Sequence, residues 1–242
     1  CGSHRDRPGL RAMTDPIELC AHGEAAWHAV AFAPLGAVWT DDGRLARAVG
    51  TVPHRFLLGG VTLTADATVP ADVPGIVCDS FACLSLPGHR AEPSGHWMIR
   101  DPGAVPRTTP VPGLTIRPAL TDDDVAWFES IAFLCDGELA TPGELHPAGS
   151  QRQPGVTLLI AEIGTEGVGT ALSVATDRVN NIGAVAVMPA QRRRGIGAAL
   201  TEAAIAVAPT LPATLSATAL GRGIYARLGF TEVGRPLHHH PV

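Results

Sequence analysis

A turn rich in arginine and glycine contains the residues best suited to bind a charged ligand. Arg192, Arg193 and Arg194 precede Gly195 and Gly197, with an apolar run before them and an alanine-rich run after them. This order indicates a strand, a tight turn and the start of a helix. Backbone N–H groups at a helix start lack intrahelical partners, and the helix dipole adds partial positive charge there. The turn is therefore expected to bind a phosphate or pyrophosphate group.

A second short pattern contains a side chain that could move a proton. Tyr225, the only tyrosine of the chain, is followed closely by Leu228, Gly229 and Phe230. A phenol with a pKa of ~10 is protonated at neutral pH and can donate its proton along a hydrogen bond. The alternative is a ring that packs against the last strand with its hydroxyl group satisfied.

Together the two patterns resemble a known family. Arg192-x-x-Gly195-x-Gly197-Ala198, after a strand ending Val185-Ala186-Val187, resembles the acetyl-CoA-binding motif of the GNAT superfamily of N-acyltransferases. The stretch 223–230 resembles the closing motif of that family, and the resemblance spans roughly 114–236. It implies that Tyr225 protonates the leaving thiolate and that the strand polarises the thioester carbonyl. It also implies that the acetyl-CoA donor is held by Val185, Ala186, Val187, Arg192, Arg193, Arg194, Gly195, Ile196, Gly197 and Ala198.

The strand before the turn departs from many relatives, which carry a glutamate there. Residues 180–187 read Asn-Asn-Ile-Gly-Ala-Val-Ala-Val and contain no acid. Glu162 or Asp177 could act as a base through water, and a water chain or an amine that arrives neutral would also serve. The identity of the base therefore stays open.

Apolar periodicity and turn residues predict an α/β (α+β) fold. From 114 to 238 the expected order is β-α-(α)-β-β-β-α-β-α-β, a complete GNAT fold with a mixed, mostly antiparallel sheet whose closing strand runs from Phe230 to Leu237. A smaller α+β domain is expected over 13–103, and the proline-rich stretch 104–113 is expected to be a linker. The first portion is expected to be either a degenerate GNAT-like half or an unrelated domain that lines the acceptor pocket. Residues 1–12 are interpreted as a tag remnant or disordered.

Composition excludes several classes of function. With 45% hydrophobic and 17% charged residues the chain should fold, and a net charge of -5 argues against binding of nucleic acid. No apolar run reaches the ~18–20 residues that span a bilayer, and no export signal opens the chain, so we expect a cytoplasmic protein without a membrane partner. The five cysteines are irregularly spaced and predict free thiols. His238, His239 and His240 cannot all face one ion from a regular strand, because side chains alternate, so no metal is expected.

The function expected from these observations is N-acetyl transfer. The chain would use acetyl-CoA as co-substrate and transfer its acetyl group to a primary amine, most simply on a small molecule, by direct attack in a ternary complex. The alternatives are a protein N-terminal or lysine acetyltransferase and a non-catalytic, CoA-binding regulatory module. Assembly as a homodimer is left open.

Overall fold

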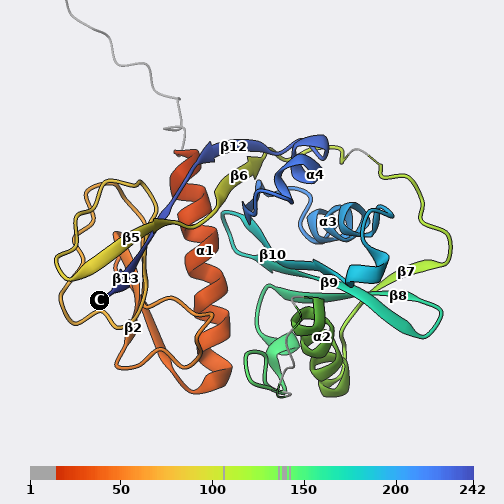
Figure 1. Cartoon of the computed structure of the whole chain (residues 1–242), viewed down its shortest axis with the longest axis horizontal. Coiled ribbons are helices and arrows are strands. Elements are labelled where there is room, and N and C mark those ends of the chain that lie inside the picture. Colours follow the sequence, from red (N-terminus) through yellow and green to blue (C-terminus); the bar gives the residue numbers. More distant parts are fainter. Residues whose placement is uncertain (1–14, 106, 136, 138–140, 142) are drawn as a thin grey trace, which may run out of the picture.

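The computed structural model describes residues 15–242 except 106, 136, 138–140 and 142, so the tag expected at 1–12 lies outside the described residues. Four α-helices and thirteen strands make up the described part (Figure 1). The helices are α1 (Pro16–Phe32), α2 (Asp122–Cys135), α3 (Ile196–Val207) and α4 (Arg222–Arg227). The strands are β1 (Val38–Asp41), β2 (Leu45–Val49), β3 (Gly60–Thr62), β4 (Val77–Asp79), β5 (His89–Pro93), β6 (His96–Arg100), β7 (Leu114–Pro118), β8 (Val156–Ile163), β9 (Glu166–Ala175), β10 (Asn180–Val187), β11 (Ala213–Ala217), β12 (Thr231–Gly234) and β13 (Leu237–Pro241).

The strands form two sheets with related topologies. The first sheet has the order β1-β2-β3-β4-β13-β5, and the second has the order β12-β6-β11-β10-β9-β8-β7. In the first sheet β3 and β4 are parallel, in the second β10 and β11 are parallel, and the other neighbours are antiparallel. The strand order of the first sheet, taken from β5 to β1, therefore corresponds strand for strand to the order of the second sheet from β12 to β8. Strand β7 is an additional edge strand of the second sheet. The two sheets thus share a strand topology, although among the described residues the N-terminal half has no helical counterparts of α3 and α4, and its GNAT-like nature stays a prediction.

The two sheets exchange one strand each. β6 comes from the N-terminal half but lies between β11 and β12 of the second sheet. In return, the C-terminal strand β13 lies between β4 and β5 of the first sheet. In Figure 1 the blue strand β13 accordingly runs among the orange and yellow strands. Each exchanged strand occupies the same position in its host sheet, which ties the halves together through backbone hydrogen bonds.

The predicted closing strand of the fold is wrong, because two separate strands take its place. Sequence periodicity indicated one closing strand from Phe230 to Leu237, but the structure has β12 and β13 in different sheets. Pro236 lies between them and lacks the N–H group that a continuous ladder would need. The predicted division into 13–103, 104–113 and 114–238 stays a prediction, and two strands cross it.

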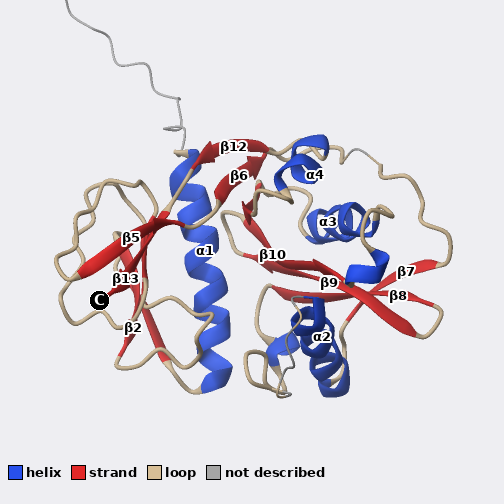
Figure 2. Cartoon of the chain, viewed as in Figure 1, coloured by secondary structure: helices blue, strands red, loops and turns tan. Residues whose placement is uncertain are grey.

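Helix α1 lies between the two halves and packs on both (Figure 2). Its N-cap is Asp15, whose side chain accepts a hydrogen bond from the Ile17 backbone N–H, and Pro16 occupies the first turn. Cys20 and Ala21 pack on the first sheet, whereas Trp27 reaches the core between α2 and the second sheet. Since α1 has apolar contacts on both sides, it joins the two cores.

The second sheet is covered on both faces. Helix α3 packs on one face through Ile196, Leu200 and Ile205. Helix α2 covers part of the other face, beside α1. Helix α2 starts with a reciprocal cap, in which the Asp124 N–H donates to the Thr121 hydroxyl and the Thr121 N–H donates to the Asp124 carboxylate. Within the described ranges, no helix has the length and apolarity required to span a bilayer.

Candidate acyl-transfer site

The predicted phosphate-binding turn has the backbone geometry that anion binding requires. Two of its residues have left-handed backbone conformations, Arg193 with φ 66° and Gly195 with φ 91°. Helix α3 begins at Ile196, directly after them. In the part of the chain that the structure describes, the backbone N–H groups from Arg193 to Ala198 have no intramolecular hydrogen-bond partner. Six donors at the positive end of a helix are thus available to the oxygens of a pyrophosphate.

The three arginines of the turn have different surroundings. The Arg192 guanidinium donates hydrogen bonds to the backbone carbonyl oxygens of Val187 (3.0 Å) and Cys135 (2.6 Å). It therefore joins the turn to the end of β10 and to α2, and its side chain serves the turn rather than a ligand. The Arg194 guanidinium contacts the Gln191 side chain, and the Arg193 and Arg194 residues are both exposed. Their two charges remain at the surface beside the free N–H groups.

Strand β10 separates from β11 as it approaches the turn. The two parallel strands pair at Asn180 and Asn181 only, as far as the described residues go. Further along, β10 has a bulge between Gly183 and Ala186, with Ala184 at φ 48°. The Thr170 hydroxyl donates to the Ala184 carbonyl oxygen over 2.9 Å and holds this bulge in place. An open strand edge of this kind can pair with an extended ligand as an additional strand would.

Glycine allows three elements to meet beside this open edge. A Cβ atom at Gly197 would lie 3.6 Å from Val187 Cγ2 and 4.0 Å from Ile224 Cδ1, so α3, β10 and α4 converge there. Val185 and Val187 are partly buried against the same core as Ile224 and Tyr225. The structure thus brings the predicted donor-binding residues of β10 and α3 to the same place as the tyrosine.

Tyr225 lies on α4 in a largely apolar setting. Its ring meets that of Phe230 edge to face, with 5.9 Å between centroids, and Gly221 approaches so closely that a Cβ atom there would be 2.9 Å from the tyrosine Cε2. Burial raises the pKa of the phenol, so it stays protonated at neutral pH. Its hydroxyl group has no hydrogen-bond partner among the described residues. A protonated, unengaged phenol can donate to a departing thiolate.

The two acids considered as bases lie elsewhere. Glu162 accepts a 2.7 Å hydrogen bond from Arg117, and its strand β8 is separated from β10 by β9. Asp177 lies in the turn that precedes β10, whereas the bulge and the phosphate-binding turn lie toward the end of that strand. The structure therefore brings neither acid to the open edge of β10.

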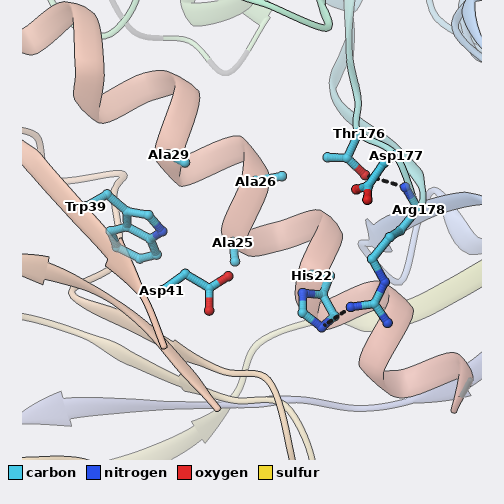
Figure 3. Close-up of a pocket in the computed structure, with 9 residues that line it drawn as sticks. All are labelled: His22, Ala25, Ala26, Ala29, Trp39, Asp41, Thr176, Asp177 and Arg178. Carbon is cyan, nitrogen blue, oxygen red and sulfur yellow. Dashed lines mark hydrogen bonds between the residues drawn. The ribbon is translucent and has the colours of Figure 1, made fainter. Parts of the chain in front are cut away.

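A cavity of about 320 Å³ lies at the start of β10 (Figure 3). One side of α1 supplies His22, Ala25, Ala26 and Ala29, and the turn between β9 and β10 lies opposite. Trp39 and Asp41 of β1 complete the lining. Within it Arg178 contacts the His22 ring over 2.6 Å, and burial together with this guanidinium lowers the pKa of His22. The cavity is at the junction of the two halves, on the side of α1 away from the bulge.

The loop 137–154, which follows α2, is anchored by a buried acid. Residues 138–140 and 142 of this loop lie outside the described residues. Glu129 of α2, fully buried, accepts backbone hydrogen bonds from Gly143 (2.5 Å), Leu145 (2.6 Å) and His146 (2.8 Å). Burial alone would raise the pKa of Glu129, but the His146 side chain, whose Nδ1 is 3.7 Å from the carboxylate, and these three backbone bonds lower it. Sequence reasoning missed this residue because it reads as one polar position on an amphipathic helix.

The fold and the site together define a class of protein. A mixed sheet whose central parallel strands separate, followed by a helix-start anion site and a tyrosine, is an arrangement suited to holding a nucleotide-linked thioester. Among the described residues, no group of three or more His, Cys, Asp and Glu side chains is placed to hold a metal ion.

Comparison with known proteins agrees with this class. Residues 143–240 match the family model of the acetyltransferase (GNAT) domain. The C-terminal part of this chain is therefore similar to a GNAT acetyltransferase domain. No curated protein matches the chain.

Solved structures share the architecture of the whole chain. A GCN5-related N-acetyltransferase from Kribbella flavida is similar over 90% of this chain and 95% of its own, with 16% identity and a TM-score of 0.59. A protein assigned to the GNAT family from Novosphingobium aromaticivorans is similar over 91% of this chain and 96% of its own, with 19% identity and a TM-score of 0.54. At this level of identity the likeness concerns the fold, and it includes both halves.

Proposed function

We propose that this protein transfers an acetyl group from acetyl-CoA to a primary amine, by direct attack within a ternary complex. The observation that carries the proposal is the open edge of β10, which leads from the bulge at Ala184 to the six free N–H groups from Arg193 to Ala198. An extended pantetheine arm fits such an edge, and a pyrophosphate fits such a helix start.

The residues of the site divide the chemistry between them. The backbone of Val185, Ala186 and Val187 would align the pantetheine arm, and a strand N–H near the bulge would polarise the thioester carbonyl. The amine attacks that carbonyl, forming a C–N bond while the C–S bond breaks. Tyr225 would give its proton to the leaving thiolate.

The enclosure of the site favours a small acceptor. Helix α1 lies across the face of the second sheet that α2 leaves uncovered, and it contacts β10 and β11 directly. A helix in this position limits the room for a polypeptide along the sheet. A protein N-terminus or a lysine side chain is the alternative acceptor, and a CoA-binding module without turnover is the alternative outside enzymes.

Calorimetric titration with acetyl-CoA tests the donor site. We expect micromolar binding by the parent protein and loss of binding in an Arg194→Glu, Gly195→Asp double variant, which adds two negative charges to the turn and places a side chain at φ 91°. Gly164→Asp, the same substitution at another exposed glycine with a left-handed backbone (φ 64°), is a matched control and should retain binding. Failure of the parent to bind acetyl-CoA would overturn the proposal.

A further inference from the structure

Acyl transfer at neutral pH requires a group that accepts the proton of the ammonium form of the acceptor, and β10 supplies no acid. The helix that crosses the second sheet beside β10 is α1, from the N-terminal half. Its Gly23 lies against the second sheet so closely that a Cβ atom there would be 2.5 Å from Thr214 Oγ1 and 3.0 Å from Asn181 Oδ1. The side chains next to Gly23 therefore lie where β10 and β11 begin to separate.

The two flanks of α1 face opposite ends of the strands. His22, Ala25, Ala26 and Ala29 line the cavity on the side of the β9–β10 turn, as Figure 3 shows. Because each residue turns the helix by about 100°, Cys20, Glu24 and Trp27 lie on the other flank, toward the bulge. Two contacts agree with this: the Cys20 thiol is 3.8 Å from the Met98 carbonyl oxygen of β6, and Trp27 borders a small void with Leu172 of β9.

Glu24 is the acid on that flank. Its side chain keeps 21% of its exposure, and among the described residues its carboxylate accepts no hydrogen bond. The nearest basic atom is His28 Nδ1 at 3.9 Å, and that nitrogen is already bonded to the Glu24 backbone carbonyl oxygen over 2.9 Å. The carboxylate is therefore reachable but unpaired.

The surroundings of Glu24 give it the properties of a base. Burial raises its pKa from 4.5 to about 7, because the protein on either side of the helix excludes most of the bulk water. The other titratable groups near it are Cys20 and His28 of α1, Cys78 of β4 and, beyond His28, His238 of β13. Burial lowers the pKa of both histidines to about 4, so both are neutral at pH 7. Among the described residues no cation stabilises the ionised form of Glu24. A carboxyl group with a pKa of about 7 can accept and release a proton near neutral pH.

We propose that Glu24, a residue of the N-terminal half, is the group that accepts the proton of the acceptor amine. The inference rests on the proposed function. The ammonium form of the acceptor gives one proton to the Glu24 carboxylate, directly or through one water, and the neutral amine attacks the thioester. Tyr225 protonates the thiolate and recovers the extra proton that the attacking nitrogen carries after forming the C–N bond, while Glu24 releases its own proton to solvent. One amide, one CoA thiol and one free proton result from one ammonium and one thioester.

The proposal assigns a role to the N-terminal half. The C-terminal half binds the donor, and α1 of the other half completes the site with the acid that β10 lacks. Strand β6 helps to fix the position of α1 beside β10. Its Met98 carbonyl oxygen contacts the Cys20 thiol of α1, and the strand itself pairs with β11.

The test compares pH profiles of acetyl-CoA turnover with a panel of primary amines. Glu24→Gln should lower turnover by about 100-fold near pH 7 and recover toward pH ~10, where the amine is neutral without help. Its affinity for acetyl-CoA should stay unchanged, which separates a lost base from a damaged donor site. Asp177→Asn, on the other flank of α1, and Glu162→Gln are matched controls and should follow the profile of the parent.

Two other outcomes have distinct meanings. A Glu24→Gln profile that coincides with that of an active parent would overturn the role of Glu24 and leave the proposed function standing. A parent that binds acetyl-CoA but acetylates no amine at any pH would overturn the proposed function, and the role of Glu24 with it.

Discussion

Gly23 of α1 lies directly on Thr214 of β11: a Cβ atom at position 23 would be 2.5 Å from the threonine hydroxyl oxygen. Thr214 is fully buried, and its hydroxyl donates to the Asn181 side chain over 3.2 Å. This contact places the helix of one half on the parallel strand pair of the other. A glycine in the middle of a helix usually costs about 1 kcal/mol relative to alanine, so its presence here reflects the lack of space.

The first prediction concerns that contact. Gly23→Ala should destabilise the protein by about 1–2 kcal/mol, opposite in sign to the usual effect of this substitution in a helix, because the added methyl group displaces Thr214. Denaturant unfolding measures the change. Adding Thr214→Ala should return more than half of the loss. Stabilisation by Gly23→Ala alone would show that the two elements are further apart than described.

The second prediction separates the roles of two neighbouring arginines. Arg192→Met removes the donors that hold the Val187 and Cys135 carbonyl oxygens, so acetyl-CoA affinity should fall about tenfold at every salt concentration. Arg193→Met removes an exposed charge, so its effect should shrink as salt increases. Calorimetric titrations at low and high salt make the comparison. A salt-sensitive effect of Arg192→Met would instead place that guanidinium on the ligand.

The third prediction concerns the proton donor. Tyr225→Phe keeps the ring against Phe230 and removes the hydroxyl group. Turnover should fall about 100-fold while acetyl-CoA binding is retained. Steady-state turnover and calorimetry on the same preparation give both values. Unchanged turnover would return the tyrosine to a packing role.

The fourth prediction uses stability as a measure of Glu24 that does not depend on activity. Its carboxyl group binds a proton more tightly in the folded protein (pKa about 7) than in the unfolded chain (4.5), so its contribution to stability is present below pH 4.5 and is lost as pH rises to about 7. The Glu24→Gln variant has no carboxyl group at this position, so it does not lose this stability as pH rises. The variant should be more stable than the parent by about 2–3 kcal/mol above pH 7 and nearly equal to it near pH 4.

The control for this prediction is the difference in unfolding free energy between the Glu24→Gln variant and the parent protein at each pH. Burial lowers the pKa of His28 to about 4, so this group makes both proteins less stable as pH falls from 6.5 to about 4. Subtracting the parent from the variant at each pH removes most of this shared trend. A difference that does not change with pH would contradict the raised pKa of Glu24.

The strand, turn and helix start around 192–198 were predictable because their signal is local. Arginine and glycine types at fixed spacing define the turn, and its left-handed residues Arg193 and Gly195 fall within it. Tyr225 was singled out for the same reason, and its role stays a proposal. Arg192 was assigned to the donor site by the resemblance, and the structure shows its guanidinium bonded to backbone carbonyl oxygens.

The remainder depends on contacts between distant parts of the chain. The pairing of His238 with Cys78 spans most of the sequence, and no periodicity in 230–241 reveals which sheet receives the strand. Glu24 was missed because a single acid in the amphipathic stretch after Asp15 reads as a solvated position. Its isolation becomes apparent only when both halves are packed against α1.

The exchange of β6 and β13 has a consequence for the order of folding during synthesis. The first sheet needs Leu237–Pro241 between β4 and β5, so it cannot close before these residues have left the ribosome. Until then β4 and β5 present unpaired edges, which are prone to association with other chains. We therefore expect nascent chains that stall after β12 to need a chaperone, whereas a completed chain nicked between β6 and β7 should stay together as two interlocked fragments.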